Sequence, residues 1–160
     1  MPGRIFLSLG SNINPQVNLL SAASELRNNF GHVDFSSVIE TVSVGSSGPN
    51  FLNAAAVFWT KKPMEELKHG FIRNLERSLG RIRTPDKNSP RTIDLDITVF
   101  NQVVVDPNIW IRVYLAVPLA ELFPTLIEEK SGQSILEISK ELKKRVFWKA
   151  RPDIDLNSTI

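Results

Sequence analysis

The stretch Arg91-Thr92-Ile93-Asp94-Leu95-Asp96-Ile97 decides most about the fold of this chain. Apolar and polar residues alternate along it, which is the two-residue period of a half-buried strand. On such a strand Asp94 and Asp96 point to the same face, with Cα atoms roughly 6.5–7 Å apart. Because aspartate is depleted in strands and like charges on one face repel, we expect a positive group above this pair.

The spacing of Asp94 and Asp96 suits one or two hard cations. Mg²⁺ prefers a few carboxylate oxygens together with phosphates, and two Mg²⁺ ions that clamp a transferring phosphoryl group lie about 3.5–4 Å apart. The alternative interpretation of the same two residues is a solvated face of an edge strand.

Arginines gather immediately before the aspartate pair, at Arg81, Arg83 and Arg91. Their forked donors match phosphate oxygens, although a solvated helix end that complements its dipole would also carry such residues. The chain contains no Gly-x-x-x-x-Gly-Lys motif, so a Walker-type phosphate loop is not indicated. The combination predicts a nucleotide-triphosphate site without a P-loop.

Hydrophobic periodicity predicts strands and helices around this stretch. The expected strands are Ile5–Leu9, Val33–Thr41, Phe51–Thr60 and Thr92–Phe100, and the expected helical segments are Pro15–Phe30, Pro63–Leu79, Pro118–Phe123 and Ser134–Val146. The order β-α-β-β-α-β is that of an α/β (α+β) ferredoxin-like fold, a mainly antiparallel sheet covered by helices, here with C-terminal additions. Because this fold hosts many activities, function must come from the site.

Length and composition point to one domain over residues 1–160, with residues 152–160 as a coil tail. The absence of cysteine excludes disulfides, thiolate catalysis and cysteine-based zinc sites, and it favours a cytoplasmic location. Apolar runs are too short to span a bilayer. A net charge of only +2 and few aromatics on the expected sheet argue against nucleic-acid or RNA binding. We expect a monomer that binds small molecules.

Five blocks of sequence carry a resemblance to a known family. In chain order they are Leu9–Asn12, Phe51–Ala55, Leu75-Glu76 with Gly80-Arg81, Pro90–Ile97, and Pro118–Leu122 followed by Pro124. On these blocks the chain resembles the 6-hydroxymethyl-7,8-dihydropterin pyrophosphokinases of folate biosynthesis over nearly its whole length. The Pro-Arg-Thr-Ile-Asp-Leu-Asp-Ile block is the specific one. The resemblance implies transfer of an intact pyrophosphoryl group from the co-substrate ATP to the pterin hydroxymethyl oxygen, releasing AMP.

The resemblance also implies roles at the nucleotide end of the site. Asp94 and Asp96 would hold two Mg²⁺ ions, which explains why no histidine or glutamate general base is evident. The remaining residues that would neutralise the triphosphate or contact the nucleotide are Arg81, Arg83, Arg91, Glu76 and Arg112.

At the pterin end, the resemblance implies that Phe51 stacks on the pterin ring and Asn53 hydrogen-bonds its polar edge. These residues lie two apart and so share one strand face. Thr41 and Val44 match positions that line the pterin pocket, and Tyr114 matches the second ring of an aromatic sandwich.

Two departures leave alternatives open. Asn88-Ser89 stand where the family has Trp-Gly, and Pro107-Asn108 stand where it has Pro-His within a longer segment. The missing histidine motivates a non-catalytic pterin- or nucleotide-binding relative as one alternative. A pyrophosphokinase for a related hydroxymethylpterin is the other.

Overall fold

The central strand of the sheet is β1 (Gly3–Ser11), which pairs antiparallel with β4 (Phe51–Thr60) on one side and β5 (Asp94–Phe100) on the other. The structure is a computed structural model that describes residues 1–43, 48–82, 84–85 and 91–158. The smaller strands are β2 (Asp34–Phe35), β3 (Ile39–Thr41), β6 (Val103–Val104) and β7 (Lys149–Ala150). Within the described residues, seven strands form one antiparallel sheet.

The strand order is β6-β5-β1-β4-β3-β7, with β2 also paired to β4. In the inner part of the sheet β1 lies between β5 and β4, and β2 and β3 pair with the other edge of β4. This is the arrangement of a split β-α-β unit, in which the first core strand lies between the third and the fourth. Here β4 is the third core strand and β5 is the fourth. The predicted ferredoxin-like fold is therefore confirmed.

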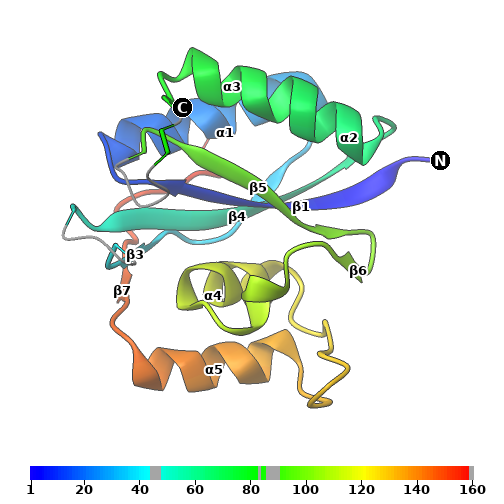
Figure 1. Cartoon of the computed structure of the whole chain (residues 1–160), viewed down its shortest axis with the longest axis vertical. Coiled ribbons are helices and arrows are strands. Elements are labelled where there is room, and N and C mark those ends of the chain that lie inside the picture. Colours follow the sequence, from blue (N-terminus) through cyan, green and yellow to red (C-terminus); the bar gives the residue numbers. More distant parts are fainter. Residues whose placement is uncertain (44–47, 83, 86–90, 159–160) are drawn as a thin grey trace.

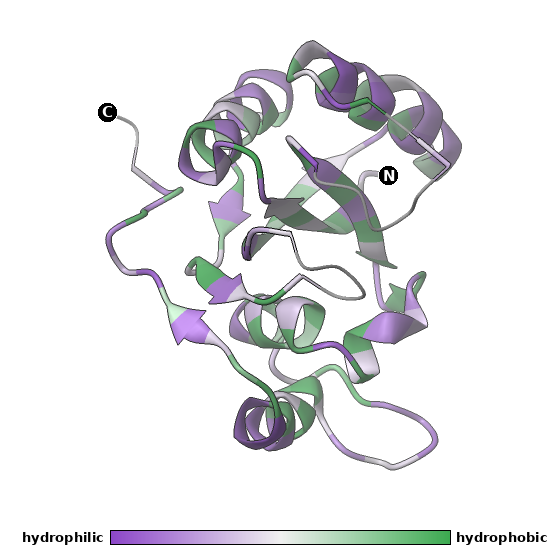
Figure 2. Ribbon diagram, turned by 60° about the vertical axis from the view of Figure 1, so that its left-hand side comes forward, coloured by the Kyte–Doolittle hydropathy of each residue, from purple (hydrophilic) through white to green (hydrophobic). Residues whose placement is uncertain are grey.

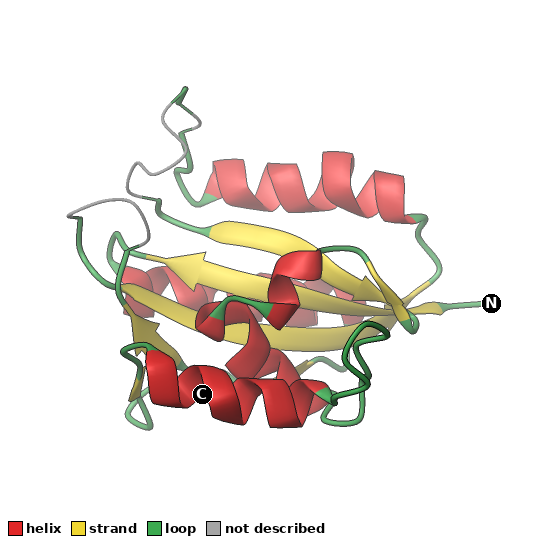
Figure 3. Ribbon diagram, turned by 60° about the horizontal axis from the view of Figure 1, so that its bottom comes forward, coloured by secondary structure: helices red, strands yellow, loops and turns green. Residues whose placement is uncertain are grey.

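Helices cover both faces of the sheet (Figure 1). The helical segments are α1 (Pro15–Phe30), α2 (Met64–Glu66), the π-helical η1 (Leu67–Ile72), α3 (Arg73–Ser78), the 3₁₀-helical η2 (Pro107–Trp110), α4 (Val113–Leu122) and α5 (Ile135–Arg145). The α2–η1–α3 run and α1 lie on one face, whereas α4 packs on the other face with α5 outside it. Figure 3 shows α2–α3 and α5 on opposite sides of the sheet.

Strand alternation divides the core into two apolar clusters and leaves a place for the site. Leu7 and Leu95 point into the cluster under α1 and α3, whereas Phe6 and Val99 point into the cluster under α4. In Figure 2, hydrophobic residues gather in the sheet and on the helix sides that face it. Asp94 and Asp96 share the α4 face, so the aspartate pair lies beside the second cluster.

The predicted strand Val33–Thr41 is broken into β2 and β3. At the break, the Ser36 hydroxyl accepts the hydrogen bond of the Ala55 N–H at 2.8 Å, a place that a backbone carbonyl takes in a regular ladder.

The capping box predicted for the last helix is present, with Ser134 and Glu137 bonded reciprocally.

The predicted helical turn over Pro118–Phe123 is too short. The helix α4 begins at Val113, so Pro118 lies in its interior, where it has no N–H to donate. Burial of Pro118 among apolar neighbours offsets the missing hydrogen bond.

None of the helices in the described residues is long and apolar enough to cross a membrane. The tail over residues 152–158 has no regular secondary structure, as predicted, and residues 159–160 lie outside the described part. The tail is nevertheless anchored, because Ile154 and Leu156 are buried in the core cluster under α1.

Candidate active site

The side chain of Asp94 is held by two arginines. Its Oδ1 accepts a hydrogen bond from Arg81 Nη1 at 2.8 Å, and its Oδ2 accepts one from Arg91 Nη1 at 2.7 Å. Arg81 is only 8% exposed and Asp94 is 23% exposed, so solvent screens the first pair little. The positive group expected above the aspartate face is confirmed.

A buried glutamate fixes Arg81 and the start of β5. Glu76 of α3 accepts the backbone N–H of Leu95 at 3.0 Å, and its Oε2 lies 3.5 Å from Arg81 Nη1. The same Arg81 nitrogen donates to the carbonyl of Ile93 at 2.9 Å. Because a hydrogen bond to a charged group is among the strong ones, the end of α3 clamps the strand that carries the aspartates.

The neighbouring Asp96 keeps access to solvent from the cavity, but the protein surrounds its carboxyl closely enough to remove part of its hydration, and its environment is acidic. Desolvation first, and then the nearby carboxylates of Asp94, Glu76 and Asp106, raise the pKa of Asp96 to about 7. Such a carboxyl binds a proton or a cation more readily than an isolated aspartate does.

These residues fit a magnesium ion. Two hard-oxygen side chains share one strand face, and the charge of Asp94 is at present balanced by guanidinium groups. Among the described residues there is no group of three or more His, Cys, Asp or Glu that could hold a metal. Mg²⁺ is commonly bound by one or two carboxylates together with waters and phosphates, and Asp94 and Asp96 supply two carboxylates.

The other end of the site is neutral and closely packed. Asn53 Nδ2 donates to Thr41 Oγ1 at 2.8 Å, and both residues are buried. A Cβ at Gly10, which pairs with Asn53 across the ladder, would lie 3.2 Å from Asn53 Oδ1 and 3.7 Å from Phe51 Cδ1. Glycine at this position therefore leaves room for both side chains.

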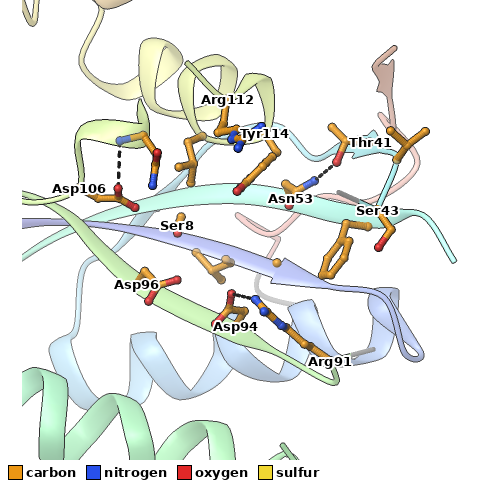
Figure 4. Close-up of a pocket in the computed structure, with 16 residues that line it drawn as sticks. Ser8, Thr41, Ser43, Asn53, Arg91, Asp94, Asp96, Asp106, Arg112 and Tyr114 are labelled. Atoms are coloured by element: carbon orange, nitrogen blue, oxygen red, sulfur yellow. Dashed lines mark hydrogen bonds and ion pairs between the residues drawn. The ribbon is translucent and has the colours of Figure 1, made fainter. Parts of the chain in front are cut away.

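One cavity of about 310 Å³ joins the two ends. Its floor is the α4 face of β1, β4 and β5, and its opposite wall is the segment that leads into α4 (Figure 4). The predicted site residues that line it are Thr41, Phe51, Asn53, Arg91, Asp94, Asp96, Arg112 and Tyr114. In Figure 4, Arg112 and Tyr114 lie across the cavity from Asp94 and Arg91.

Other predicted residues lie elsewhere. Glu76 and Arg81 do not line the cavity; they stand behind Asp94 and hold it in place. Val44 and Arg83 lie outside the described residues. Half-buried Tyr114 does face the cavity, and burial raises the pKa of its phenol, so it presents a neutral ring.

The lining residues that the sequence interpretation did not include among the site residues are Ser8, Leu9, Gly10, Val42, Ser43, Asp106, Asn108 and Leu115. Ser8 pairs with Asp96 across the ladder, and its place between Leu7 and Leu9 in an alternating strand could have predicted it. Asp106 and Asn108 line the cavity next to η2, where Asp106 Oδ1 accepts the Asn108 N–H at 3.0 Å. Their segment has no periodicity, so only its turn residues signalled it.

Comparison with known proteins decides the family. Residues 6–124 match the family described as 7,8-dihydro-6-hydroxymethylpterin-pyrophosphokinase. The chain belongs to this family. It is 31% identical to the 2-amino-4-hydroxy-6-hydroxymethyldihydropteridine pyrophosphokinase of Bacillus subtilis, covering 94% of this chain and 93% of that protein. It is 27% identical to the protein of the same name from Synechocystis, covering 96% of this chain and 84% of that protein.

Solved structures share the fold. A chain described as HPPK-DHPS, in complex with substrates, superposes with a TM-score of 0.69 at 12% identity, over 90% of this chain. The HPPK-DHPS of Plasmodium falciparum gives a TM-score of 0.66 at 13% identity, over 91% of this chain. This chain spans 44% and 45% of those two chains, so the likeness concerns one part of each.

Proposed function

We propose that the cavity between β5 and α4 performs the reaction of this family, with Asp94 and Asp96 as the ligands of two Mg²⁺ ions. The reaction transfers the pyrophosphoryl group of ATP to the hydroxymethyl group of a 6-hydroxymethyl-7,8-dihydropterin and releases AMP, a step of folate biosynthesis. The observation that carries the proposal is one cavity lined by the aspartate pair at one end and by Phe51 and Asn53 at the other.

Bound Mg²⁺ would neutralise phosphate oxygens and lower the pKa of the pterin hydroxyl. Asp94 and Asp96 hold the ions from one strand face. Arg81 and Arg91 both pair with Asp94 and balance its charge. Since guanidinium groups bind phosphate and carboxylate alike, Arg91 can turn to the triphosphate and release Asp94 for a cation.

Across the cavity, exposed Arg112 faces the aspartates and supplies a further donor for the triphosphate. Arg83 remains a predicted nucleotide contact. Glu76 was also predicted to contact the nucleotide, but it is buried and does not line the cavity, so its role at this end is indirect, through its hold on Arg81. Charges of this kind, fixed before the reaction, stabilise the transition state of phosphoryl transfer without reorganisation.

The pterin end supplies stacking and hydrogen bonds. Phe51 and Tyr114 line the cavity and offer two rings for a flat bicyclic ligand. The amide of Asn53, fixed by Thr41, offers polar atoms to its edge. A cavity of about 310 Å³ is at the small end of ligand pockets, which suits a pterin and part of a triphosphate.

The assay that tests the proposal mixes the protein with ATP, Mg²⁺ and 6-hydroxymethyl-7,8-dihydropterin and separates the nucleotides by chromatography. We expect AMP in step with consumption of the pterin, and loss of turnover when EDTA removes the metal. Formation of ADP, or no ATP consumption with the pterin present, would contradict the proposal.

A panel of hydroxymethylpterins distinguishes the dihydropterin from a related substrate, because the preferred compound shows the highest kcat/KM. The cytoplasmic location and the monomeric state remain predictions, and gel filtration of the purified protein tests the second.

A further inference from the structure

The C-terminal strap, residues 149–158, runs from the end of α5 along the edge of the sheet toward α1 (Figure 1). Its strand β7 pairs with β3, and the Arg151 N–H continues the contact by donating to the Val38 carbonyl at 2.9 Å. Beyond Arg151, Asn157 accepts the Phe35 N–H at 3.0 Å and donates to the Phe35 carbonyl at 2.9 Å. The strap is therefore fastened on both sides of Arg151.

Arg151 is the polar centre of the strap. It makes two hydrogen bonds to Asp153, at 3.0 and 2.9 Å, while its Nη1 donates to Glu40 Oε1 at 2.8 Å. The second oxygen of Glu40 accepts the side-chain amide of Asn50 at 2.9 Å. Arg151, Glu40 and Asn50 thus form one hydrogen-bonded chain, in which both oxygens of Glu40 are used.

The surroundings favour an ionised Glu40. The hydrogen bonds from Asn50 and Arg151 lower the pKa of the Glu40 carboxyl. Arg151 and Glu40 are 27% and 22% exposed, so this pair is less screened than an ordinary surface ion pair.

The hydrogen-bonded chain of Arg151, Glu40 and Asn50 lies directly behind the pterin end of the cavity. Glu40 directly precedes Thr41 within β3, and Asn50 lies immediately before Phe51, the first residue of β4. Because neighbouring residues of a strand point to opposite faces, Glu40 lies on the far side of the wall from Thr41. Thr41 pairs with Phe51 across the β3–β4 ladder, and its hydroxyl accepts a hydrogen bond from the side-chain amide of Asn53. The hydrogen bonds of Glu40 therefore join β3 and β4 where these strands present the side chains proposed to bind the pterin.

We propose that Arg151 is a positioning residue for pterin binding. Through Glu40 it holds Asn50, and with it the start of β4, so that Phe51 and Asn53 keep the separation from Thr41 that the ligand requires. The inference rests on the proposed function, since it assigns the ligand at this end of the cavity. Among the described residues, the hydrogen-bond partners of Arg151 are Val38, Glu40, Asp153 and Ile154, and none of these lies at the aspartate end. We therefore expect its effect to be confined to the pterin.

The test compares Arg151→Met with Lys140→Met, which removes the same charge from an exposed position on α5. Fluorescence titration of 6-hydroxymethylpterin gives the pterin Kd, in the presence of Mg²⁺ and a saturating non-hydrolysable ATP analogue. We expect Arg151→Met to raise the Kd about three- to tenfold, a size typical of indirect coupling. Arg151→Lys restores part of the affinity. Lys140→Met leaves the pterin Kd within about twofold of wild type, and the affinity of Arg151→Met for the nucleotide also stays within about twofold.

Asn50→Ala keeps the test decisive if Arg151→Met folds poorly, because Asn50 is exposed and outside the strap. We expect Asn50→Ala to raise the pterin Kd by a similar factor. The pterin Kd of the double variant is no higher than that of either single variant, because both substitutions break the same hydrogen-bonded chain through Glu40. Equal effects of Arg151→Met and Lys140→Met, or additive effects of Arg151→Met and Asn50→Ala, would overturn the inference. Failure of the wild-type protein to bind the pterin at all would overturn the proposed function instead.

Discussion

The two ends of the cavity are built by different physical means. At the pterin end, Asn53 and Thr41 are buried at 4% and 3% exposure and joined by a neutral hydrogen bond. At the aspartate end, Asp94 is paired with two arginines and Asp96 is exposed in an acidic environment. The neutral end is held by a hydrogen bond within the protein, whereas under the proposed function the charged end exchanges partners when phosphates and cations bind.

The contrast has an energetic basis. A buried amide left without a partner costs about 1–3 kcal/mol, so the Asn53–Thr41 pair is made within the protein. Buried charges cost more and are kept in balance. The arginines that pair with Asp94 provide that balance. Their guanidinium groups are equally suited to bind the phosphates of ATP.

The largest expected effect is that of Asp96→Asn, which keeps the shape of the side chain and removes its charge. We expect Mg²⁺-dependent kcat to fall by about 10³-fold or more, as when a group that stabilises developing charge is lost. Pterin binding, measured by fluorescence titration, stays within about threefold because the other end of the cavity is untouched.

The control is Asp34→Asn, an exposed aspartate on β2, which should leave kcat unchanged. Wild-type turnover by the Asp96→Asn protein would show that the Asp96 carboxylate does not hold the metal. The distinction between a neutral end and a charged, metal-binding end of the cavity would then be wrong.

Asn53→Ala tests the neutral end and ranks second. The substitution removes the amide and leaves Thr41 Oγ1 without its partner, so we expect the KM for the pterin to rise about 30- to 100-fold. The KM for ATP changes little. The free energy of unfolding drops by about 1–3 kcal/mol, which urea denaturation measures. Equal losses for ATP and pterin would show that the two ends are not separable.

The smallest predicted effect is a shift in titration of one carboxyl. The pKa of Asp96 is raised to about 7, so in metal-free protein its carboxyl gains a proton as the pH falls through 7. Mg²⁺ competes with that proton, and saturating Mg²⁺ lowers the midpoint by at least about one unit. Carbon-13 NMR of the aspartate carboxyls measures both midpoints. A metal-free midpoint near the ordinary value of about 3.9 would contradict the acidic environment.

Much of this arrangement could be predicted from the sequence, because side chains alternate between the two faces along most of each strand. The exception is the register shift between Phe6 and Leu7, which places Val99 on the face opposite to Leu95. The pattern from Ile93 to Ile97 placed both aspartates on one face, and Phe51 with Asn53 followed from the next long strand. The same alternation placed Ser8 on the polar face, although the sequence interpretation passed over it.

What could not be predicted depends on contacts distant in the chain. Asp106 and Asn108 reach the cavity from a segment whose turns have no period. Ile154 and Leu156 look like part of a polar tail, but their burial depends on α1, more than a hundred residues earlier. Pairing of Arg151 with Glu40 spans the same distance, and no local pattern records it.

The central claim is that one cavity brings the β- and γ-phosphates of ATP to a pterin as a unit. Phosphorus-31 NMR of a reaction mixture containing protein, Mg²⁺, ATP and 6-hydroxymethyl-7,8-dihydropterin tests it most directly. The account predicts AMP and a pterin product with two coupled phosphorus signals, formed in equal amounts. A pterin product with a single phosphorus signal, accompanied by ADP, would contradict it.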